Sequence, residues 1–224
     1  MLDREALRKR YEKVRSEIPA HVKLIAVSKK RTAEEIQALY DFGHRDLGEN
    51  YPQELRDKAP LLPTDIRWHF IGNLQSNKVK YVAPIASVVH TIDSVKLMDA
   101  LNERAISAKR SIEILVQVHI AKETTKHGLS PFEAEELLSG WKDTRWPALV
   151  PTGLMGMATF TEDDDLIRRE FRSLRACFES IKKNATGLSD RFKELSMGMS
   201  GDARIAIEEG STMVRIGTAI FGER

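Results

Sequence analysis

Short apolar runs alternate with amphipathic stretches along most of the chain. Eight of the runs have the length of buried strands, and they cover Lys23–Ser28, Arg45–Glu49, Trp68–Gly72, Val88–Ile92, Ile112–Ile120, Leu149–Met157, Lys193–Met197 and Met213–Gly217. Helix-like stretches separate them, among which are Thr32–Phe42, Ser94–Ala108, Pro131–Leu138 and Asp163–Lys183. Strands that alternate with helices predict a parallel sheet, and eight parallel strands are the number that closes a barrel.

The N-terminal segment predicts a further helix ahead of the first strand. Leu7, Tyr11, Val14 and Ile18 recur at helical spacing, which places them on one face. The alternative fold is a doubly wound sheet, but no Gly-x-Gly-x-x-Gly turn follows the first apolar run. Because the sequence has no linker and no internal repeat, we expect one α/β domain over residues 1–224. Its predicted fold is a single (β/α)₈ barrel of the TIM type with an extra N-terminal helix.

Two small-residue turns near the C-terminus each follow a predicted strand directly. One is Gly198–Gly201, with the sequence Gly-Met-Ser-Gly, and the other is the pair Gly217 and Thr218. In (β/α)₈ barrels the loops after strands seven and eight commonly form a phosphate site. Glycine lets the backbone approach an anion, while Ser200 and Thr218 add hydroxyl donors to the backbone amides. The C-terminal part of the chain therefore predicts a phosphorylated ligand.

The ends of the first two predicted strands carry further reactive groups. Lys29 follows the first strand, where burial and the neighbouring Lys30 and Arg31 cations would lower its pKa. A lysine of lowered pKa forms Schiff bases with aldehydes, whereas the alternative is an ordinary solvated side chain. The second strand ends with a carboxylate, an amide and a phenol, of which the amide belongs to Asn50.

Two polar residues inside predicted strands each allow two interpretations. Arg215 interrupts an apolar run in the final strand, where a guanidinium is costly without a partner. It either pairs with a core carboxylate such as Glu49 or faces the ligand pocket, where it can donate a hydrogen bond to a ring nitrogen. His69, in the third predicted strand, is either a pocket residue or a hydrogen-bonded core histidine.

Composition excludes several classes of protein. The 35 basic residues nearly balance the 33 acidic ones, so the net charge of +2 does not favour nucleic acid as a partner. The single cysteine, Cys177, rules out an internal disulfide, and its helical position favours packing over nucleophilic catalysis. There is no zinc-ligand spacing, no Walker loop and no Gly-x-Ser-x-Gly elbow. With a charged N-terminus and no run of membrane-spanning length, we expect a cytoplasmic protein without membrane association.

Seven motifs spread over essentially the whole chain carry a family resemblance. They are AVSK (Ala26–Lys29), GENY (Gly48–Tyr51), WHFIGNLQSNK (Trp68–Lys78), HTID (His90–Asp93), GLM (Gly153–Met155), LSMGMS (Leu195–Ser200) and GSTMVRIGTAIFG (Gly210–Gly222). With these motifs the chain resembles the pyridoxal phosphate homeostasis proteins, which are single-domain relatives of the fold-type III alanine racemases. The last two motifs are long and specific. The resemblance implies the fold of the alanine racemase N-terminal domain and pyridoxal 5′-phosphate as the cofactor.

The same resemblance implies a role for each candidate site residue. Lys29 would hold the cofactor as a Schiff base, the internal aldimine. The remaining cofactor-binding residues would be Ser200, Gly217 and Thr218 at the phosphate, Arg215 near the pyridine nitrogen, Asn50 beside the ring and His69 in the pocket lining. An arginine does not deliver a proton to the ring as an aspartate would, so the ring is a weaker electron sink. No metal site is implied.

One departure from the family pattern follows the lysine. The family commonly continues with Thr-Lys-Pro, whereas here Lys29 is followed by Lys30, Arg31 and Thr32. Arg31 keeps a basic residue at the second position. The proline that would start the next helix is lost, but the alignment of the strand and the preceding serine favour Lys29 as the cofactor lysine.

The resemblance implies a binding protein that buffers or delivers pyridoxal phosphate within the cell and has no catalytic residues. The alternative is a pyridoxal phosphate-dependent racemase or related amino-acid enzyme. Racemisation needs acid–base groups on both faces of the carbanion. In the related racemases one of them is a tyrosine from a C-terminal β domain supplied across a dimer, which we do not expect here because the chain ends at Arg224. A sugar-phosphate lyase or isomerase would explain the phosphate site and the lysine, but not Arg215 or the motifs.

The expected partners are pyridoxal phosphate itself and apo forms of the enzymes that use it. Without a partner domain of the racemase kind, we expect a monomer. Lys126, in the loop after the fifth predicted strand, is either a second aldehyde-binding site or a solvated charge.

Overall fold

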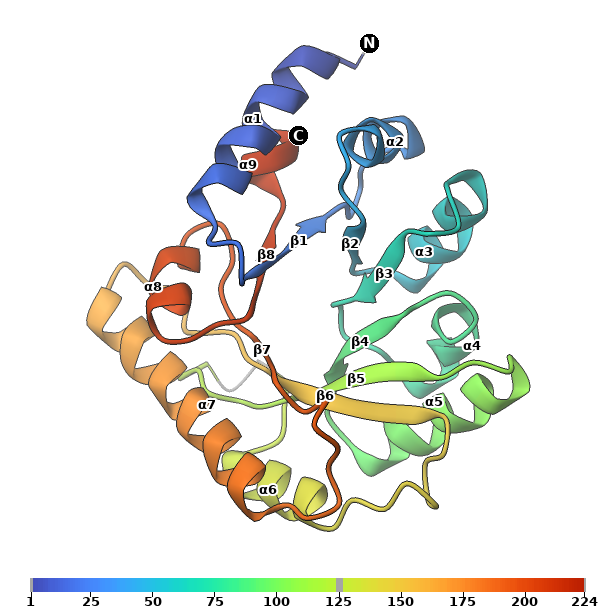
Figure 1. The fold of residues 1–224 in the computed structure, drawn as a ribbon, viewed down its shortest axis with the longest axis vertical. Helices are drawn as coiled ribbons and strands as arrows, with labels where there is room; N and C mark the ends of the chain where they lie inside the picture. Colours follow the sequence, from blue (N-terminus) through green and yellow to red (C-terminus); the bar gives the residue numbers. More distant parts are fainter. Residues whose placement is uncertain (1, 124–126, 224) are drawn as a thin grey trace.

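Eight parallel strands close into a barrel in the computed structural model, which describes residues 2–123 and 127–223 (Figure 1). The strands are β1 (Lys23–Val27), β2 (Asp46–Glu49), β3 (Arg67–Phe70), β4 (Val88–Ile92), β5 (Ile112–Gln117), β6 (Leu149–Met155), β7 (Glu194–Ser196) and β8 (Met213–Ile216). They follow one another around the barrel in chain order, and β8 pairs with β1 to close it. In that closing register Ile25 lies opposite Arg215. All eight predicted strands and the barrel are therefore confirmed.

A helix follows every strand and packs on the outside of the barrel (Figure 1). The helices are α1 (Arg4–Glu17), α2 (Ala33–Asp41), α3 (Pro52–Lys58), α4 (Val79–Val82), α5 (Val95–Ser107), α6 (Pro131–Ser139), α7 (Asp164–Asn184), α8 (Ala203–Glu208) and α9 (Thr218–Phe221). Helix α1 precedes the barrel, as the apolar spacing predicts, and buries Leu7, Tyr11 and Val14. The short helices α3 and α4 were not predicted, because one or two turns are too few for a helical period to show.

Helix α2 begins without the proline that the family pattern supplies. The Thr32 hydroxyl accepts a hydrogen bond from the Glu35 amide at 3.2 Å, and the Glu35 carboxylate accepts one from the Thr32 amide at 2.8 Å. This reciprocal capping box satisfies two amides that would otherwise lack partners at the helix start. The departure in sequence after Lys29 is thus compatible with a well-formed helix.

The largest apolar core lies between the barrel wall and the surrounding helices. Leu39 of α2, Phe70 of β3 and Phe171 of α7 are among its fully buried side chains. Inside the barrel a smaller apolar cluster is formed by Val88, Leu115, Met155 and Met213. The interior is therefore packed with side chains, as in other (β/α)₈ barrels.

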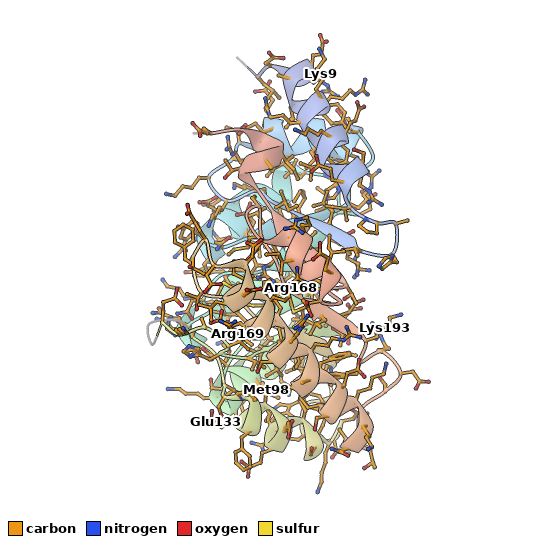
Figure 2. All side chains as sticks on the ribbon, turned by 90° about the vertical axis from the view of Figure 1, so that its left-hand side faces the viewer. Lys9, Met98, Glu133, Arg168, Arg169 and Lys193 are labelled. Atoms are coloured by element: carbon orange, nitrogen blue, oxygen red, sulfur yellow. The ribbon has the colours of Figure 1, made fainter. Side chains whose placement is uncertain are left out.

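Ion pairs attach α8 to the long helix α7. Arg168, labelled on α7 in Figure 2, contacts the carboxylates of Glu208 and Glu209 at 2.6 and 2.7 Å. Arg172, one turn further along α7, reaches Glu209 at 2.9 Å. Because α8 follows the loop after β7, these contacts help to fix that loop. Within the described residues, no helix combines the length and the apolar character needed to cross a membrane.

Candidate functional site

A cavity of about 240 Å³ opens at the carboxyl ends of the strands. Six of the seven predicted site residues line it, namely Lys29, Asn50, Ser200, Arg215, Gly217 and Thr218. They come from the ends of β1, β2, β7 and β8, which are far apart in sequence but neighbours around the barrel mouth. Closing the barrel is what brings them together.

Five further residues complete the lining and were not assigned to the site from the sequence. They are Val27, Arg31, Ile71, Met157 and Met199. Side chains along a strand alternate between the two faces of the sheet, so Ile71 shares the inward face with the residue two positions earlier. That alternation, applied past the strand end, is the signal that would have added Ile71 to the candidate residues.

His69 does not line the cavity, which corrects the pocket role expected for it. It is completely buried inside the barrel, below the level of Ile71. Its Nδ1 atom lies 2.8 Å from His90 Nε2, and its Nε2 atom lies 3.0 Å from Asp46 Oδ1. His69 is therefore the hydrogen-bonded core histidine of the two interpretations.

A strained turn presents Lys29 to the cavity. The next residue, Lys30, has a φ of +59°, in the left-handed region that costs a side-chain-bearing residue on the order of 1 kcal/mol. The Lys30 amide donates a hydrogen bond to Glu54 Oε2 at 2.7 Å, which holds the turn. Lys29 lines the cavity and Lys30 does not. Of the two adjacent lysines, Lys29 is therefore the one that borders the cavity.

A cluster of charged groups around the buried Glu49 supports this turn from behind. The Lys58 ammonium donates to Glu49 Oε1 at 2.9 Å, to Glu54 Oε2 at 2.6 Å and to the Ser28 carbonyl at 2.9 Å. The Ser28 hydroxyl donates to Glu49 Oε1 at 2.7 Å. Burial raises the pKa of Glu49, although the Lys58 charge opposes the shift. Glu49 thus pairs with Lys58, and the pairing with Arg215 considered from the sequence does not form.

Arg215 lies at the floor of the cavity with uncharged hydrogen-bond partners. Its guanidinium donates to the Ser196 carbonyl at 2.8 Å, to the Ser196 hydroxyl at 2.6 Å and to the Gly156 carbonyl at 3.1 Å. Burial lowers the pKa of Arg215 to about 10, which leaves the side chain charged at neutral pH. Since none of these three acceptors is a carboxylate, the positive charge is not neutralised by them. It remains available to a ligand in the cavity.

The turns after β7 and β8 form one side of the cavity, as the sequence predicts. Gly198 has a φ of +88°, and a Cβ atom there would lie 2.6 Å from the Ala206 methyl group, so glycine is needed. The Gly198 carbonyl accepts a hydrogen bond from the Arg215 amide at 3.0 Å, which joins the two turns. Gly217 directly precedes α9, and the first amides of a helix have no acceptor within the helix. Together with the Ser200 and Thr218 hydroxyls, these groups suit an anion.

Asn50 lies on the opposite side of the cavity, where the loops after β2 and β3 meet. A Cβ atom on Gly72 would lie only 2.0 Å from the Asn50 carbonyl oxygen, so this close approach requires glycine. In the described part of the chain, the Asn50 Oδ1 atom is buried without a hydrogen-bond partner. A buried polar atom of this kind is costly unless a ligand or water satisfies it.

The site therefore combines an amine, a buried cation and an anion-binding turn around one small cavity. Ile71 and Met157 supply apolar surface between these polar groups. Such a site suits a compact ligand that carries an aldehyde for Lys29, an anionic group for the turns, and an acceptor for Arg215. Lys126 lies outside the described residues, and Cys177 is buried, with its pKa raised to about 12 by burial and by Glu135.

This fold and site define a barrel of the alanine racemase type. The family model described as the N-terminal domain of alanine racemase matches residues 2–224. An alanine racemase of Clostridium difficile superposes with a TM-score of 0.76, covering 97% of this chain and 56% of the racemase, at 13% sequence identity. At that identity the likeness concerns the fold alone.

More similar proteins narrow the class. The pyridoxal phosphate homeostasis protein of Vibrio alginolyticus is 41% identical over 214 residues, which cover 92% of this chain and 88% of that protein. The structure of PipY from Synechococcus elongatus without pyridoxal phosphate has a TM-score of 0.90 at 33% identity and covers 96% of this chain and all of PipY. PipY with pyridoxal phosphate bound gives a TM-score of 0.85. The chain belongs to the family of pyridoxal phosphate homeostasis proteins.

Proposed function

We propose that this chain binds pyridoxal 5′-phosphate as a Schiff base on Lys29 and serves the homeostasis of that cofactor in the cytoplasm. The observation that carries the proposal is the convergence of Lys29, Arg215 and the two anion-binding turns on one cavity. Relatives that bear the name pyridoxal phosphate homeostasis protein, and PipY with the cofactor bound, support the choice of ligand.

The residues around the cavity fit this ligand in three respects. Ser200, Gly217 and Thr218 can receive its phosphate, and glycine suits position 217 because a Cβ there would lie 3.2 Å from Val27. The Asn50 Oδ1 atom, which is buried without a hydrogen-bond partner among the described residues, can accept a hydrogen bond from a donor group of the ligand. Arg215 offers a donor to a ring nitrogen.

The residues of the site also favour binding of the cofactor without catalysis. When bound, the cofactor supplies an electrophilic aldehyde and a ring that withdraws electrons. Arg215 keeps its proton, because its pKa of about 10 lies well above neutral pH, so it donates a hydrogen bond without protonating the ring nitrogen. A ring that is not protonated stabilises carbanions poorly. This arrangement supports a role in buffering the cofactor or delivering it to apo enzymes. We propose that the chain acts as a monomer.

Titration with pyridoxal phosphate tests the proposal. The wild type should develop a visible absorbance band as the cofactor is added, and Lys29→Ala should lose the band. Lys30→Ala is the matched control: it removes the adjacent lysine, which does not line the cavity, and should keep the band. A wild-type protein that shows no band at saturating cofactor would contradict the proposal.

A second experiment separates the binding protein from an amino-acid enzyme. The cofactor-loaded protein is incubated with each common amino acid, and the enantiomers and products are quantified by chiral chromatography. We expect turnover far below the usual enzyme range of about 1–1000 s⁻¹. Racemisation within that range would favour the alternative function.

A further inference from the structure

A chain of hydrogen bonds crosses the interior of the barrel from β2 to Arg215. Asp46 Oδ1 lies 3.0 Å from His69 Nε2, and His69 Nδ1 lies 2.8 Å from His90 Nε2. His90 Nδ1 then lies 3.0 Å from the Ser196 hydroxyl, which accepts from Arg215 at 2.6 Å. Both histidines and Ser196 are completely buried. No contact in this chain is longer than an ordinary hydrogen bond.

The chain connects the two ends of the barrel. Asp46 is the first residue of β2 and lines a separate surface cavity of about 450 Å³ at the amino ends of the strands, beside Lys23 and His44. Arg215 lies at the other end, in the lining of the candidate cofactor cavity. The intermediate residues come from β3, β4 and β7, so three further strands contribute to the connection (Figure 1).

The chemistry of the two ends determines the direction of every hydrogen bond. Arg215 can only donate, and an ionised Asp46 can only accept. If His69 donates from Nε2 to Asp46, its Nδ1 atom must accept from His90 Nε2. His90 Nδ1 then accepts the Ser196 proton, and the serine lone pairs accept from Arg215. Each donor is matched to one acceptor, and both histidines are neutral.

The opposite direction is disfavoured by burial. It would require a protonated His69, with a proton on both ring nitrogens, and would leave the Ser196 proton without an acceptor in the chain. Burial lowers the pKa of His69, although the hydrogen bond to Asp46 opposes this. Burial, His69 and Arg215 together place the pKa of His90 well below its usual value. Two neutral histidines with an ionised Asp46 are therefore the favoured state.

We propose that Asp46, His69, His90 and Ser196 are positioning residues for Arg215, forming a directional relay that aims its guanidinium into the cavity and couples its charge to the Asp46 carboxylate. The charge of Asp202 opposes the effect of burial on the pKa of Arg215. The relay adds a second carboxylate to a guanidinium whose three described hydrogen bonds go to uncharged acceptors. Aligned hydrogen bonds polarise one another, so the carboxylate acts through the histidines and the serine oxygen that faces Arg215. The hydrogen bond with His69 and the charges of Lys23 and Arg67 lower the pKa of Asp46 against the effect of burial, which keeps this carboxyl ionised.

The relay predicts a specific tautomer for each histidine, and cofactor-free protein suffices to test it. Long-range ¹H–¹⁵N correlation spectra of the ¹⁵N-labelled protein distinguish Nε2–H, Nδ1–H and doubly protonated rings. Single His69→Gln and His90→Gln variants assign the signals. We expect both rings to carry the proton on Nε2 at neutral pH. A proton on His90 Nδ1, or a doubly protonated His69, would overturn the proposed direction.

The effect on the cofactor site rests on the proposed function and is tested with matched serines. Ser196→Ala removes the link between His90 and Arg215 but leaves both backbone carbonyl acceptors in place. Ser211→Ala is the control, because Ser211 is equally buried and its hydroxyl contacts backbone carbonyls of residues 195, 197 and 213. We expect Ser196→Ala to weaken pyridoxal phosphate binding about tenfold and to shift the absorbance maximum of the bound cofactor. Ser211→Ala should leave both unchanged.

Asp46→Asn supplies a second variant at the accessible end of the relay. The amide oxygen can still accept from His69, so this variant removes the charge and keeps the hydrogen bond. It should shift the absorbance maximum in the same direction as Ser196→Ala. If wild type binds the cofactor and neither variant shifts the band relative to Ser211→Ala, the relay is refuted. If wild type does not bind, the proposed function fails, while the imidazole spectra still decide the relay.

Discussion

A half-buried cation, Lys58, and a fully buried one, Arg215, stand near the mouth of the barrel, and their partners differ in kind. Lys58 forms ion pairs with Glu49 and Glu54, on the side of the barrel that carries Lys29. Arg215, on the side that carries the anion-binding turns, donates to two carbonyls and a hydroxyl. The charge of a cation that is paired with carboxylates is largely neutralised, so it attracts a ligand weakly. The charge of a cation whose hydrogen-bond acceptors are uncharged can still attract a ligand. The first arrangement stabilises the fold and the second prepares a site.

Lys58 and Arg215 also differ in whether their side chains line the cavity. Lys58 lies behind the Lys29 turn and is not part of the cavity lining, while Arg215 is. Each is costly to bury without compensation. The comparison therefore predicts that removing Lys58 mainly costs stability and removing Arg215 mainly costs ligand binding.

The largest expected effect is on stability, in Lys58→Met. Removing this cation leaves the fully buried Glu49 without its ion-pair partner, which costs about 3–5 kcal/mol in comparable cases. Urea unfolding measures the loss. Lys9→Met is the control, since the Lys9 side chain is 73% exposed and should change stability by no more than about 0.5 kcal/mol. A loss below about 1 kcal/mol in Lys58→Met would show that the pair is not a structural support.

The next effect is on ligand binding, in Arg215→Met. This variant removes a charge-assisted donor, so we expect pyridoxal phosphate affinity to fall by about 30- to 100-fold in absorbance titrations. The unfolding free energy should fall less than in Lys58→Met, because relief from burying the charge offsets the carbonyls left without donors. Unchanged affinity, or a stability loss above that of Lys58→Met, would reverse the comparison.

The contributions of two carboxyls to stability change with pH in opposite directions. One is Glu49, beside Lys58, and the other is Asp46, at the far end of the relay to Arg215. The raised pKa of Glu49 means that its contribution favours folding below pH 4.5 and is lost as pH rises through the raised value. The lowered pKa of Asp46, at the far end of the relay to Arg215, arises because hydrogen bonding to His69 and nearby cations outweigh burial. Its contribution is present above pH 3.8 and is lost as pH falls through the lowered value.

Unfolding curves between pH 3 and 7 for wild type, Glu49→Gln and Asp46→Asn test these signs over the range of ordinary carboxyl pKa values, about 4. Relative to Glu49→Gln, wild type should gain stability as the pH falls. Relative to Asp46→Asn, it should lose stability. If wild type gained stability, or lost it, relative to both variants as the pH falls, Glu49 and Asp46 would not have pKa values shifted in opposite directions.

The smallest effect concerns the support of the anion-binding turn by α7. Arg168→Met removes the contacts to Glu208 and Glu209 and should weaken phosphate-dependent binding about two- to threefold by loosening α8. Arg169→Met, on the same helix, is the control, because Arg169 is exposed and lies beside the labelled Arg168 in Figure 2. Comparing pyridoxal phosphate with pyridoxal isolates the contribution of the phosphate. Equal effects of the two variants would exclude this support.

The strands, and the convergence of six candidate residues on one cavity, could be predicted from the sequence for a common reason. Apolar runs mark buried strands, and in a closed parallel barrel the residues after those strands meet at one end. Lys29, Ser200 and Thr218 therefore converge although they are far apart in the chain. Which residues meet at this end can therefore be predicted from their positions just past the strands, without knowledge of the side-chain packing.

Depth inside the barrel could not be predicted in the same way. His69 and Ile71 share the inward face of one segment, but only the packed structure shows that Ile71 reaches the cavity while His69 lies beneath it. The orientation of Arg215 was equally open, because choosing between an ion pair with Glu49 and a place in the ligand pocket requires the packed positions of β2 and β8. Short helices such as α4, with four residues, give too little periodicity to be found.

The most direct test of the central claim is to trap the cofactor and find the residue that carries it. The loaded protein is reduced with borohydride, digested, and mapped by mass spectrometry, with Lys29→Ala treated in parallel. We predict a phosphopyridoxyl group on Lys29 and none on Lys30, since Lys29 alone of the two lines the cavity. A modification on Lys30, or equal labelling of many surface lysines in wild type and Lys29→Ala, would contradict the account.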